Sequence, residues 1–118
     1  MHELSLVMSI LQIAEENARN AGADLIEEIE LDMGVLSGVE PNAFDFAWNQ
    51  ATKGTLLEQA VLKINRISGE VLCLYCNQPF SASQLYESCP SCGSHWHQIL
   101  QGKEFRVKTL LVSSKETA

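Results

Sequence analysis

Two Cys-x-x-Cys pairs constrain this 118-residue chain more than any other feature of its sequence. They contain all four of its cysteines: Cys73 and Cys76, then, after twelve residues, Cys89 and Cys92. Two intervening residues let a tight turn point both thiolates at one ion, and a second pair completes the tetrahedral sulfur shell that suits Zn²⁺. Because a four-thiolate shell leaves no open position for water or substrate, the spacing predicts a structural zinc site.

Disulfides, unliganded thiols and a redox site fit the four cysteines less well than zinc does. Unliganded buried thiols or stray disulfides would rarely produce two pairs with the same spacing. A thioredoxin-like redox site needs the motif once, at a strand-to-helix junction in a βαβ context. Cysteines of a protein in a reducing compartment also bind metal more often than they form disulfides.

Composition and charge exclude other classes of function. With 46% hydrophobic residues the chain is expected to be globular, and a net charge of −7 disfavours nucleic acid, which is bound mainly through Lys and Arg. There is no Lys or Arg between Arg66 and Lys103, so the cysteine-containing segment is not expected to hold phosphates either. No apolar run approaches the ~20 residues that span a bilayer, and no basic leader precedes one. We therefore expect a soluble, cytoplasmic protein.

The first half of the chain has the periodicity of a helix and then of a strand. Apolar residues recur at spacings of three and four from Leu4 to Ala18, which predicts an amphipathic helix, and Gly22 follows where a left-handed cap would lie. From Leu25 to Val35 apolar and acidic residues alternate. This alternation predicts a half-buried strand. Its outer side is expected to be acidic and to carry Glu28, Glu30 and Asp32.

Three further segments complete the expected fold. Pro41 suits the first turn of a second helix, which presents Phe44, Ala47, Trp48 and Ala51 on one side and ends before Gly54. Weaker alternation over Val61–Ile67 and clear alternation over Phe105–Leu111 predict two strands. The fold class is therefore α+β, a small sheet of about three strands flanked by two helices. We expect residues 1–69 and 103–118 to form this α/β domain and residues 70–102 to form an inserted zinc-ribbon-like domain.

The amino terminus offers a second set of metal donors. Histidine at position 2 should prevent removal of Met1, because aminopeptidases that remove the initiator methionine generally require a small second residue. The Met1 amine, the His2 amide nitrogen and the His2 imidazole then form adjacent chelate rings, and such nitrogen donors favour the square-planar geometry of Ni²⁺ and Cu²⁺. The Glu3 amide nitrogen, or a donor from elsewhere, is available for the fourth position. Taken alone, three residues are a weak motif, and an exposed polar start to a helix is the better explanation of them.

The amino-terminal residues and the cysteine pairs together form a more specific motif than the amino-terminal residues alone. Met1-His2-Glu3 before an amphipathic helix, then Gly34-Val35-Leu36-Ser37-Gly38-Val39-Glu40, then the two cysteine pairs, resembles the hydrogenase nickel-incorporation proteins of the HypA/HybF family. The resemblance extends over essentially the whole chain. It implies a non-enzymatic nickel metallochaperone that delivers Ni²⁺ for maturation of nickel-iron hydrogenase.

The resemblance also implies sites and partners. His2, with the Met1 amine and the Glu3 backbone nitrogen, matches the nickel site, and the four cysteines match the zinc site. The implied partners are the GTPase HypB and the precursor of the hydrogenase large subunit, and some relatives also serve urease. Some relatives complete the nickel shell with a histidine from the zinc domain, a place for which His95 and His97 are candidates. We expect a monomer or weak homodimer, with no nucleic-acid or membrane partner.

Two other classes of function compete with this hypothesis. A zinc-ribbon adaptor that only binds proteins would have no nickel site and would be indifferent to its amino terminus. An enzyme is the poorest candidate, because the chain shows no nucleophile–base pair, no phosphate loop and no open metal shell. The sequence assigns Glu40 no role beyond a partner contact or a solvated helix start.

Overall fold

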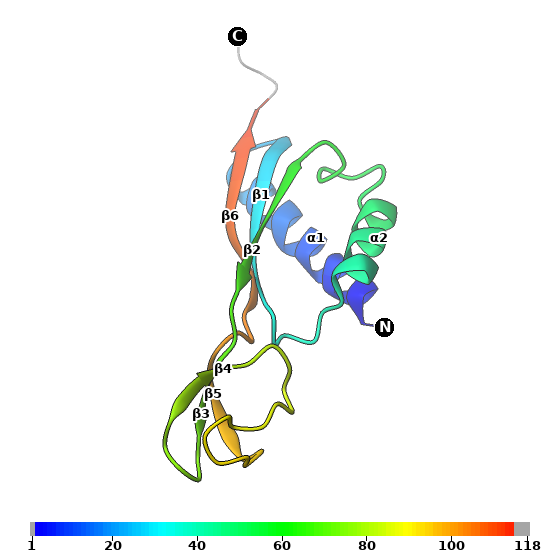
Figure 1. Ribbon diagram of the computed structural model, residues 1–118. Helices are drawn as coiled ribbons and strands as arrows, with labels where there is room; N and C mark the ends of the chain where they lie inside the picture. The colour runs from blue at the N-terminus through cyan, green and yellow to red at the C-terminus, as the bar shows by residue number, and fades with distance from the viewer. Residues whose placement is uncertain (1, 115–118) are drawn as a thin grey trace. The chain divides into compact units, whose positions relative to one another are not determined.

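The computed structural model describes residues 2–114. Among these residues, none of the helices is both long enough and apolar enough to cross a bilayer. Two helices and six strands follow one another along the chain (Figure 1): α1 (Glu3–Asn20), β1 (Leu25–Gly34), α2 (Pro41–Ala51), β2 (Val61–Ile67), β3 (Glu70–Cys73), β4 (Pro79–Ser81), β5 (His97–Gln101) and β6 (Phe105–Ser113).

The chain separates into two compact units. The first, which we call the helix–sheet unit, contains the described residues up to 31, residues 39–64 and those from 107 onward. The second, the cysteine unit, contains residues 32–38 and 65–106. The assignment of a nickel-binding domain to residues 1–69 and 103–118, and of a zinc-binding domain to residues 70–102, stays a prediction.

Helix α1 supplies much of the core of the helix–sheet unit. Its buried apolar residues are spaced three and four apart, as expected from the sequence, so they form one stripe along the helix. That stripe consists of Val7, Ile10, Leu11, Ala14 and Ala18. The predicted cap is also present: Gly22 has a φ of 70° and donates its N–H to the carbonyl of Arg19.

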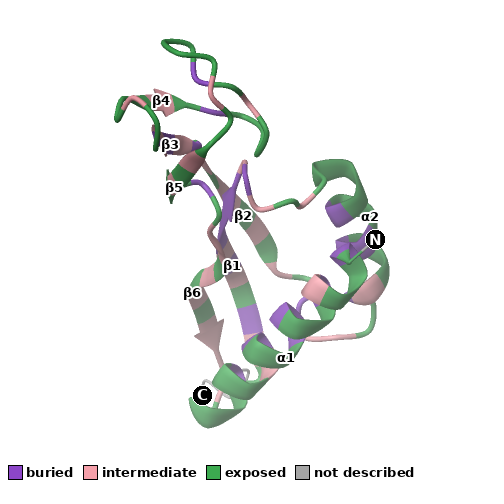
Figure 2. Cartoon of the chain, turned by 90° about the horizontal axis from the view of Figure 1, so that it is seen from below, coloured by how far each residue is buried: buried purple, intermediate pink, exposed green. Residues whose placement is uncertain are grey.

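Helix α2 begins and ends where the sequence predicts. Phe44, Ala47 and Trp48 are buried, and the rings of Phe44 and Trp48 lie 5.8 Å apart between centroids. Fully burying a large apolar side chain contributes roughly 1.5–3 kcal/mol, so the two aromatic residues account for much of the stability of this helix. Both helices cover the same face of the sheet, and Figure 2 shows the buried side of α1 directed toward β1.

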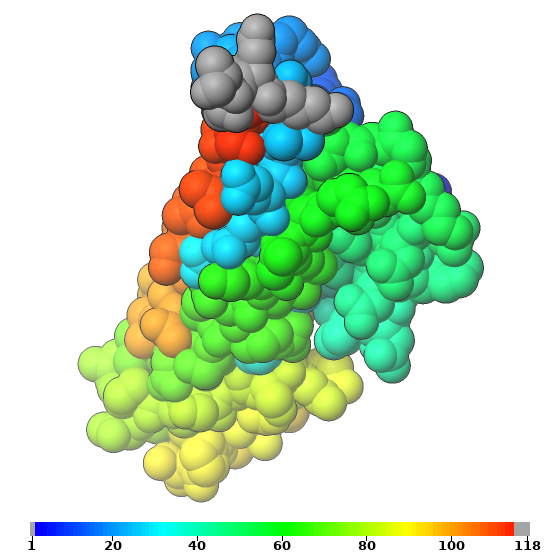
Figure 3. All heavy atoms as spheres, turned by 90° about the horizontal axis from the view of Figure 1, so that it is seen from above, coloured from blue at the N-terminus to red at the C-terminus, as the bar shows by residue number. Residues whose placement is uncertain are grey.

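The helices pack on a three-stranded sheet with the strand order β2-β1-β6, which confirms the expected small sheet. The side chains of the three strands appear as adjacent bands in Figure 3, orange to red for β6, cyan for β1 and green for β2. Ion pairs link neighbouring strands in this unit: Lys63 to Glu28 at 3.3 Å and Lys108 to Glu30 at 3.9 Å. Their side chains are partly exposed, so each pair contributes little to stability.

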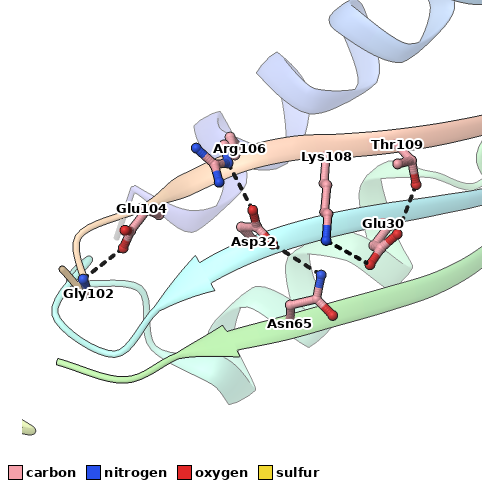
Figure 4. A network of polar contacts seen from close by, with 8 residues as sticks. All are labelled: Glu30, Asp32, Asn65, Gly102, Glu104, Arg106, Lys108 and Thr109. Atoms are coloured by element: carbon pink, nitrogen blue, oxygen red, sulfur yellow. Dashed lines mark hydrogen bonds and ion pairs between the residues drawn. The ribbon is translucent and has the colours of Figure 1, made fainter.

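Asp32 departs from the expected acidic outer side of β1. It is buried, with an exposed fraction of 3%, and its two oxygens accept hydrogen bonds from residues of β2 and β6, the strands on either side of β1. Arg106 Nε donates at 2.8 Å and Asn65 Nδ2 donates at 3.1 Å (Figure 4). Because a buried carboxylate without partners is costly, these two contacts explain why an acidic residue is found among buried neighbours. The alternation of residues along β1 could not predict these contacts, because Asn65 and Arg106 lie far from Asp32 in the sequence.

The cysteine unit has its own small sheet, in the order β4-β3-β5, with both pairings antiparallel. These three short strands are absent from the sequence-based expectation. Their core is small: buried Leu36, Val71 and Ala82, with Val35, Phe80 and Ile99 packed against them. Each of these strands has only three to five residues, which is too few for the alternation of apolar and polar residues to reveal it in the sequence.

Close backbone contacts surround Leu36. A Cβ atom on Gly34 would lie 1.8 Å from the carbonyl oxygen of Gly102, and one on Gly69 would lie 2.1 Å from that of Ala82. Hydrogen bonds hold the same segments together, including Gly34 N–H to the Glu104 carbonyl at 2.7 Å and Leu36 N–H to the Gly102 carbonyl at 2.8 Å. Only glycine permits this approach at position 34, because any side chain would collide with backbone that cannot rotate away.

We therefore predict that Gly34→Ala destabilises the protein strongly. Displacing the backbone of Gly102 should lower the free energy of unfolding by about 3 kcal/mol or more, at the upper end of the cost of overpacking. Urea unfolding of the zinc-loaded protein measures the change. Gly38→Ala is the matched control, because Gly38 has a φ of 84° but no atom within 4 Å of the added methyl. It should cost only about 1–2 kcal/mol, and an equal loss in both variants would contradict the contact argument.

Candidate metal centre

The first cysteine turn follows the end of strand β3. Cys73 closes the strand, and Cys76 directs its backbone N–H to Cys73 Sγ at 3.5 Å. Asn77 then adopts a left-handed conformation, with a φ of 65°, and donates its N–H to the Cys73 carbonyl at 2.9 Å. The carbonyl of Gln78 accepts from Cys73 N–H at 3.0 Å and closes the turn. Both sulfurs of the pair are thereby presented on the same side of the backbone.

The second cysteine turn repeats the backbone hydrogen bonds of the first, although its N–H to sulfur contact comes from the residue two places after the first cysteine, where the first turn uses the residue three places after. Ser91 N–H points to Cys89 Sγ at 3.4 Å, and Gly93 donates to the Cys89 carbonyl at 2.8 Å. Gly93 has a φ of 79°, at the position that Asn77 occupies in the first turn, and the Ser94 carbonyl accepts from Cys89 N–H at 2.8 Å. Asparagine and glycine are the residues that most readily adopt this conformation, so their place directly after each second cysteine was a signal in the sequence.

The two turns bring the four sulfurs together. Each sulfur lies within 4.8 Å of the other three, with 3.5 Å between the sulfurs of Cys73 and Cys92 and 3.7 Å between those of Cys76 and Cys89. A tetrahedral zinc with Zn–S bonds of ~2.3 Å places its sulfurs ~3.8 Å apart, whereas a disulfide requires ~2 Å. All four cysteines are free thiols. The donor set therefore fits one Zn²⁺ and does not fit a pair of disulfides.

The environment of the sulfurs already favours thiolates at selected positions. The backbone N–H of Cys76 lowers the pKa of Cys73 to about 6, against the opposing effect of burial. Burial raises the pKa of Cys76 to about 12, and the neighbouring sulfurs of Cys89 and Cys73 add to this increase. Four thiolates at such short distances repel one another. A divalent cation removes this repulsion, which is the electrostatic reason for the set to hold a metal.

His95 and His97, the two later histidines, lie in the cysteine unit but outside the sulfur cluster. The Nδ1 atom of exposed His95 is 3.1 Å from the Tyr86 carbonyl oxygen. His97 pairs with Cys73 across β3 and β5, and its ring meets the edge of Phe80 at 6.2 Å between centroids. Among the described residues, His97 Nδ1 is a buried polar atom with no hydrogen-bond partner.

The expected nickel donors lie at the start of α1. His2 is the N-cap residue of this helix, and its exposed side chain makes no capping hydrogen bond. Its carbonyl is occupied, because it accepts from Leu6 N–H at 3.0 Å and from Ser5 Oγ at 2.9 Å. The imidazole is therefore not used by the helix cap. Met1, whose amine completes the expected donor set, lies outside the described residues.

Glu3 uses its side chain to join the starts of the two helices. One carboxylate oxygen accepts from the backbone N–H of Glu40 at 3.1 Å, and the side chain is buried, with an exposed fraction of 6%. Hydrogen bonds accepted by this carboxylate, including the one from the Glu40 N–H, lower the pKa of Glu3 to about 2, so the carboxylate is ionised at neutral pH.

Glu40 has a structural role that the sequence did not reveal. Its carboxylate accepts from Ala43 N–H at 2.8 Å and from Asn42 N–H at 3.2 Å, so it caps the N-terminus of α2. Aspartate, asparagine, serine and threonine are the usual residues at this position. A glutamate before Pro41 was therefore not recognised as a cap.

Comparison with known proteins identifies the family. The model of the family described as "Hydrogenase/urease nickel incorporation, metallochaperone, hypA" matches residues 1–112. The chain is 44% identical to the hydrogenase maturation factor HypA of Parabacteroides distasonis, over 98% of this chain and the full length of that protein. It is 39% identical to the protein of the same name from Rhizobium leguminosarum, over 95% of this chain and 99% of the relative.

Solved structures agree with the sequence comparisons. The solution structure of the Ni metallochaperone HypA from Helicobacter pylori is similar to this structure with a TM-score of 0.67, at 29% identity and over 98% of this chain and all of that one. Both the sequence motifs and the combination of a helix–sheet unit with a four-cysteine cluster are thus accounted for by one family. The chain belongs to the HypA family of hydrogenase/urease nickel-incorporation metallochaperones.

Proposed function

We propose that this protein binds one Ni²⁺ at its amino terminus and delivers it for maturation of nickel-iron hydrogenase. The observation that carries the proposal is the His2 imidazole, which lies exposed at the first turn of α1 and is not used as a helix cap. The Met1 amine, the His2 amide and imidazole nitrogens and the Glu3 amide nitrogen would form adjacent chelate rings. The first N–H groups of a helix lack intrahelical acceptors, so metal binding there breaks no helical hydrogen bond.

Cys73, Cys76, Cys89 and Cys92 are the proposed ligands of a structural Zn²⁺. The sulfur–sulfur distances and the repeated turn support this assignment. With four thiolate ligands the zinc has no position for a substrate, so its role is to hold the cysteine unit together. Nickel is the transferred cargo and zinc the resident ion.

The proposed partners follow from the family. They are the GTPase HypB and the precursor of the hydrogenase large subunit, which would receive nickel in the cytoplasm. The function is binding and transfer, with no catalytic residue assigned. The main alternative is a zinc-ribbon adaptor that binds proteins and has no nickel site, and nickel titration distinguishes the two.

We predict that the purified protein carries about one zinc per chain and that Cys89→Ser loses it. Because the apolar cluster of the cysteine unit is small, with Leu36, Val71 and Ala82 as its buried members, this variant should unfold locally, whereas the helices keep their own core. Metal analysis by mass spectrometry and far-UV circular dichroism measure the two effects.

Ser91→Ala is the matched control for the zinc prediction. Ser91 lies between the two cysteines of the second turn, but only its backbone N–H contacts sulfur. It should retain both zinc and stability. Absence of zinc in wild-type protein prepared without chelators, or loss of the helical signal in Cys89→Ser, would contradict the assignment.

For nickel, we predict that His2→Ala lowers the affinity about a hundredfold or more, equivalent to about 2.7 kcal/mol. A Gly-Ser extension before Met1 should have a similar effect, because it converts the terminal amine into a peptide. Protons must leave the amine, imidazole and amide on binding, so affinity should weaken as pH falls from about 8 to about 6. Isothermal titration calorimetry on zinc-loaded protein measures the nickel affinity of both variants and its dependence on pH.

The control is the same Gly-Ser extension placed after Ala118, which should leave nickel affinity unchanged. Zinc content should be equal in every variant. Equal nickel affinity in wild type, His2→Ala and the amino-terminal extension would move the site to His95 and His97. If none of the proteins bound nickel, the adaptor function would replace the proposed one.

A further inference from the structure

The β4-β3-β5 sheet of the cysteine unit has two different faces. Side chains alternate along a strand, so Val71 and Cys73 lie on one face of β3, while Glu70, Leu72 and Leu74 lie on the other. The first face is fully used: Val71 and Cys73 are completely buried against the small core and the sulfur cluster. The second face is less buried: Leu72 is half-buried and Leu74 is exposed.

The strand register shows which residues share this second face. Leu72 lies opposite Pro79 on one side and Gln98 on the other, so these three form one row. Leu74 donates its N–H to the Trp96 carbonyl at 2.9 Å, which continues the pairing by one residue and forms a second row. Leu100 is the extra residue where the pairing shifts between Val71↔Ile99 and Glu70↔Gln101, and it is included because it follows Ile99, whose partner Val71 faces the core. We call this set the outer face: Leu72, Leu74, Pro79, Trp96, Gln98 and Leu100.

The outer face is apolar and exposed. Trp96 is 71% exposed, Leu100 54% and Leu74 47%. Tyr75, which follows Leu74, is 77% exposed. None of the six residues of the outer face carries a charge, and Glu70 is the charged residue that lies beside them on the same side of β3. Exposed tryptophan and tyrosine beside leucine are typical of protein-binding surfaces, since aromatic residues are enriched at the centres of interfaces.

Charge around the outer face indicates what can cover it. Glu70 lies on the same side of β3, at the end away from Trp96, and its carboxylate accepts from Ser81 Oγ at 2.9 Å. Leu74 follows Glu70 by four positions, and four steps of extended chain span about 13 Å. The segment from 67 to 102 contains Glu70 and Glu87 but no Lys or Arg. A partner segment therefore needs a basic residue about 13 Å from the apolar side chains that reach Trp96.

We propose that the outer face is a docking surface for a protein segment that presents aliphatic side chains next to arginine or lysine. The aliphatic side chains cover Leu74, Trp96 and Leu100, and the basic residue pairs with Glu70. A second copy of this chain fits less well, because it brings no cation from the same segment and a net charge of −7. Covering Glu70 without a cation would leave a desolvated carboxylate unpaired. The inference goes beyond nickel binding and does not require it.

The test uses full-length, zinc-loaded protein and two synthetic extended peptides. Both alternate leucine with serine, and they differ only in carrying arginine or glutamate four residues from the central leucine. Tryptophan fluorescence reports binding, because Trp96 is exposed and Trp48, with an exposed fraction of 6%, is not. The arginine peptide should shift the emission to shorter wavelength and bind about tenfold more tightly than the glutamate peptide. Trp96→Phe should abolish the shift.

Matched variants locate the binding surface. Leu74→Ser should weaken the arginine peptide about tenfold, the loss expected for an interface anchor. Leu85→Ser should have no effect, although Leu85 has the same exposed fraction of 47% and belongs to the same unit. Glu70→Gln should remove the preference between the two peptides. Leu100→Ser serves as a second test of the face should Leu74→Ser lose its zinc.

Several outcomes would overturn the proposal. These are equal binding of both peptides to the wild type, no binding of the arginine peptide, or unchanged affinity when both Leu74 and Leu100 are replaced. Sedimentation equilibrium provides the remaining outcome. If the protein alone forms a dimer that Leu100→Ser dissociates, the outer face is covered by a second copy and the proposed partner is wrong.

Discussion

Convergence of four thiolates is the constraint on which the cysteine unit depends. Its apolar cluster is small, with buried Leu36, Val71 and Ala82 packed against half-buried residues. Two backbone turns, each closed by a left-handed residue after the second cysteine, supply what the core lacks. They place the four sulfurs together, so one bound ion links both turns and stabilises the whole unit. The helix–sheet unit has no such requirement, because α1 and α2 bury a continuous apolar stripe.

Sequence reasoning succeeded where a pattern is local and repeated. The stripe of α1, the boundaries of α2, the three longer strands and the spacing of the cysteines all appear within short windows of the chain. Recognition of the family added the expectation of nickel at His2, which stays a prediction. The absence of Lys and Arg between Arg66 and Lys103 was also visible in the sequence. The outer face lies within this segment.

What the sequence did not reveal depends on contacts between distant residues. Asp32 follows the polar parity of β1, yet Arg106 and Asn65 allow it to be buried. Gly34 looks like a simple strand end until Gly102 is seen to approach it. Strands β3 to β5 are three to five residues long, which is shorter than any periodicity can establish. In each case the local structure depends on a residue that is distant in the sequence and becomes a neighbour only in the folded protein.

The position of Glu3 has a consequence for how related sequences are compared. Its backbone nitrogen is a proposed nickel donor, and a backbone nitrogen is available from every residue except proline. Its side chain meets the Glu40 N–H instead, at the start of α2. The contact of this side chain therefore serves the junction of two helices, whereas the proposed metal site uses only the backbone. A relative with a different side chain at this position could retain the metal donors, provided that another contact joined its helices.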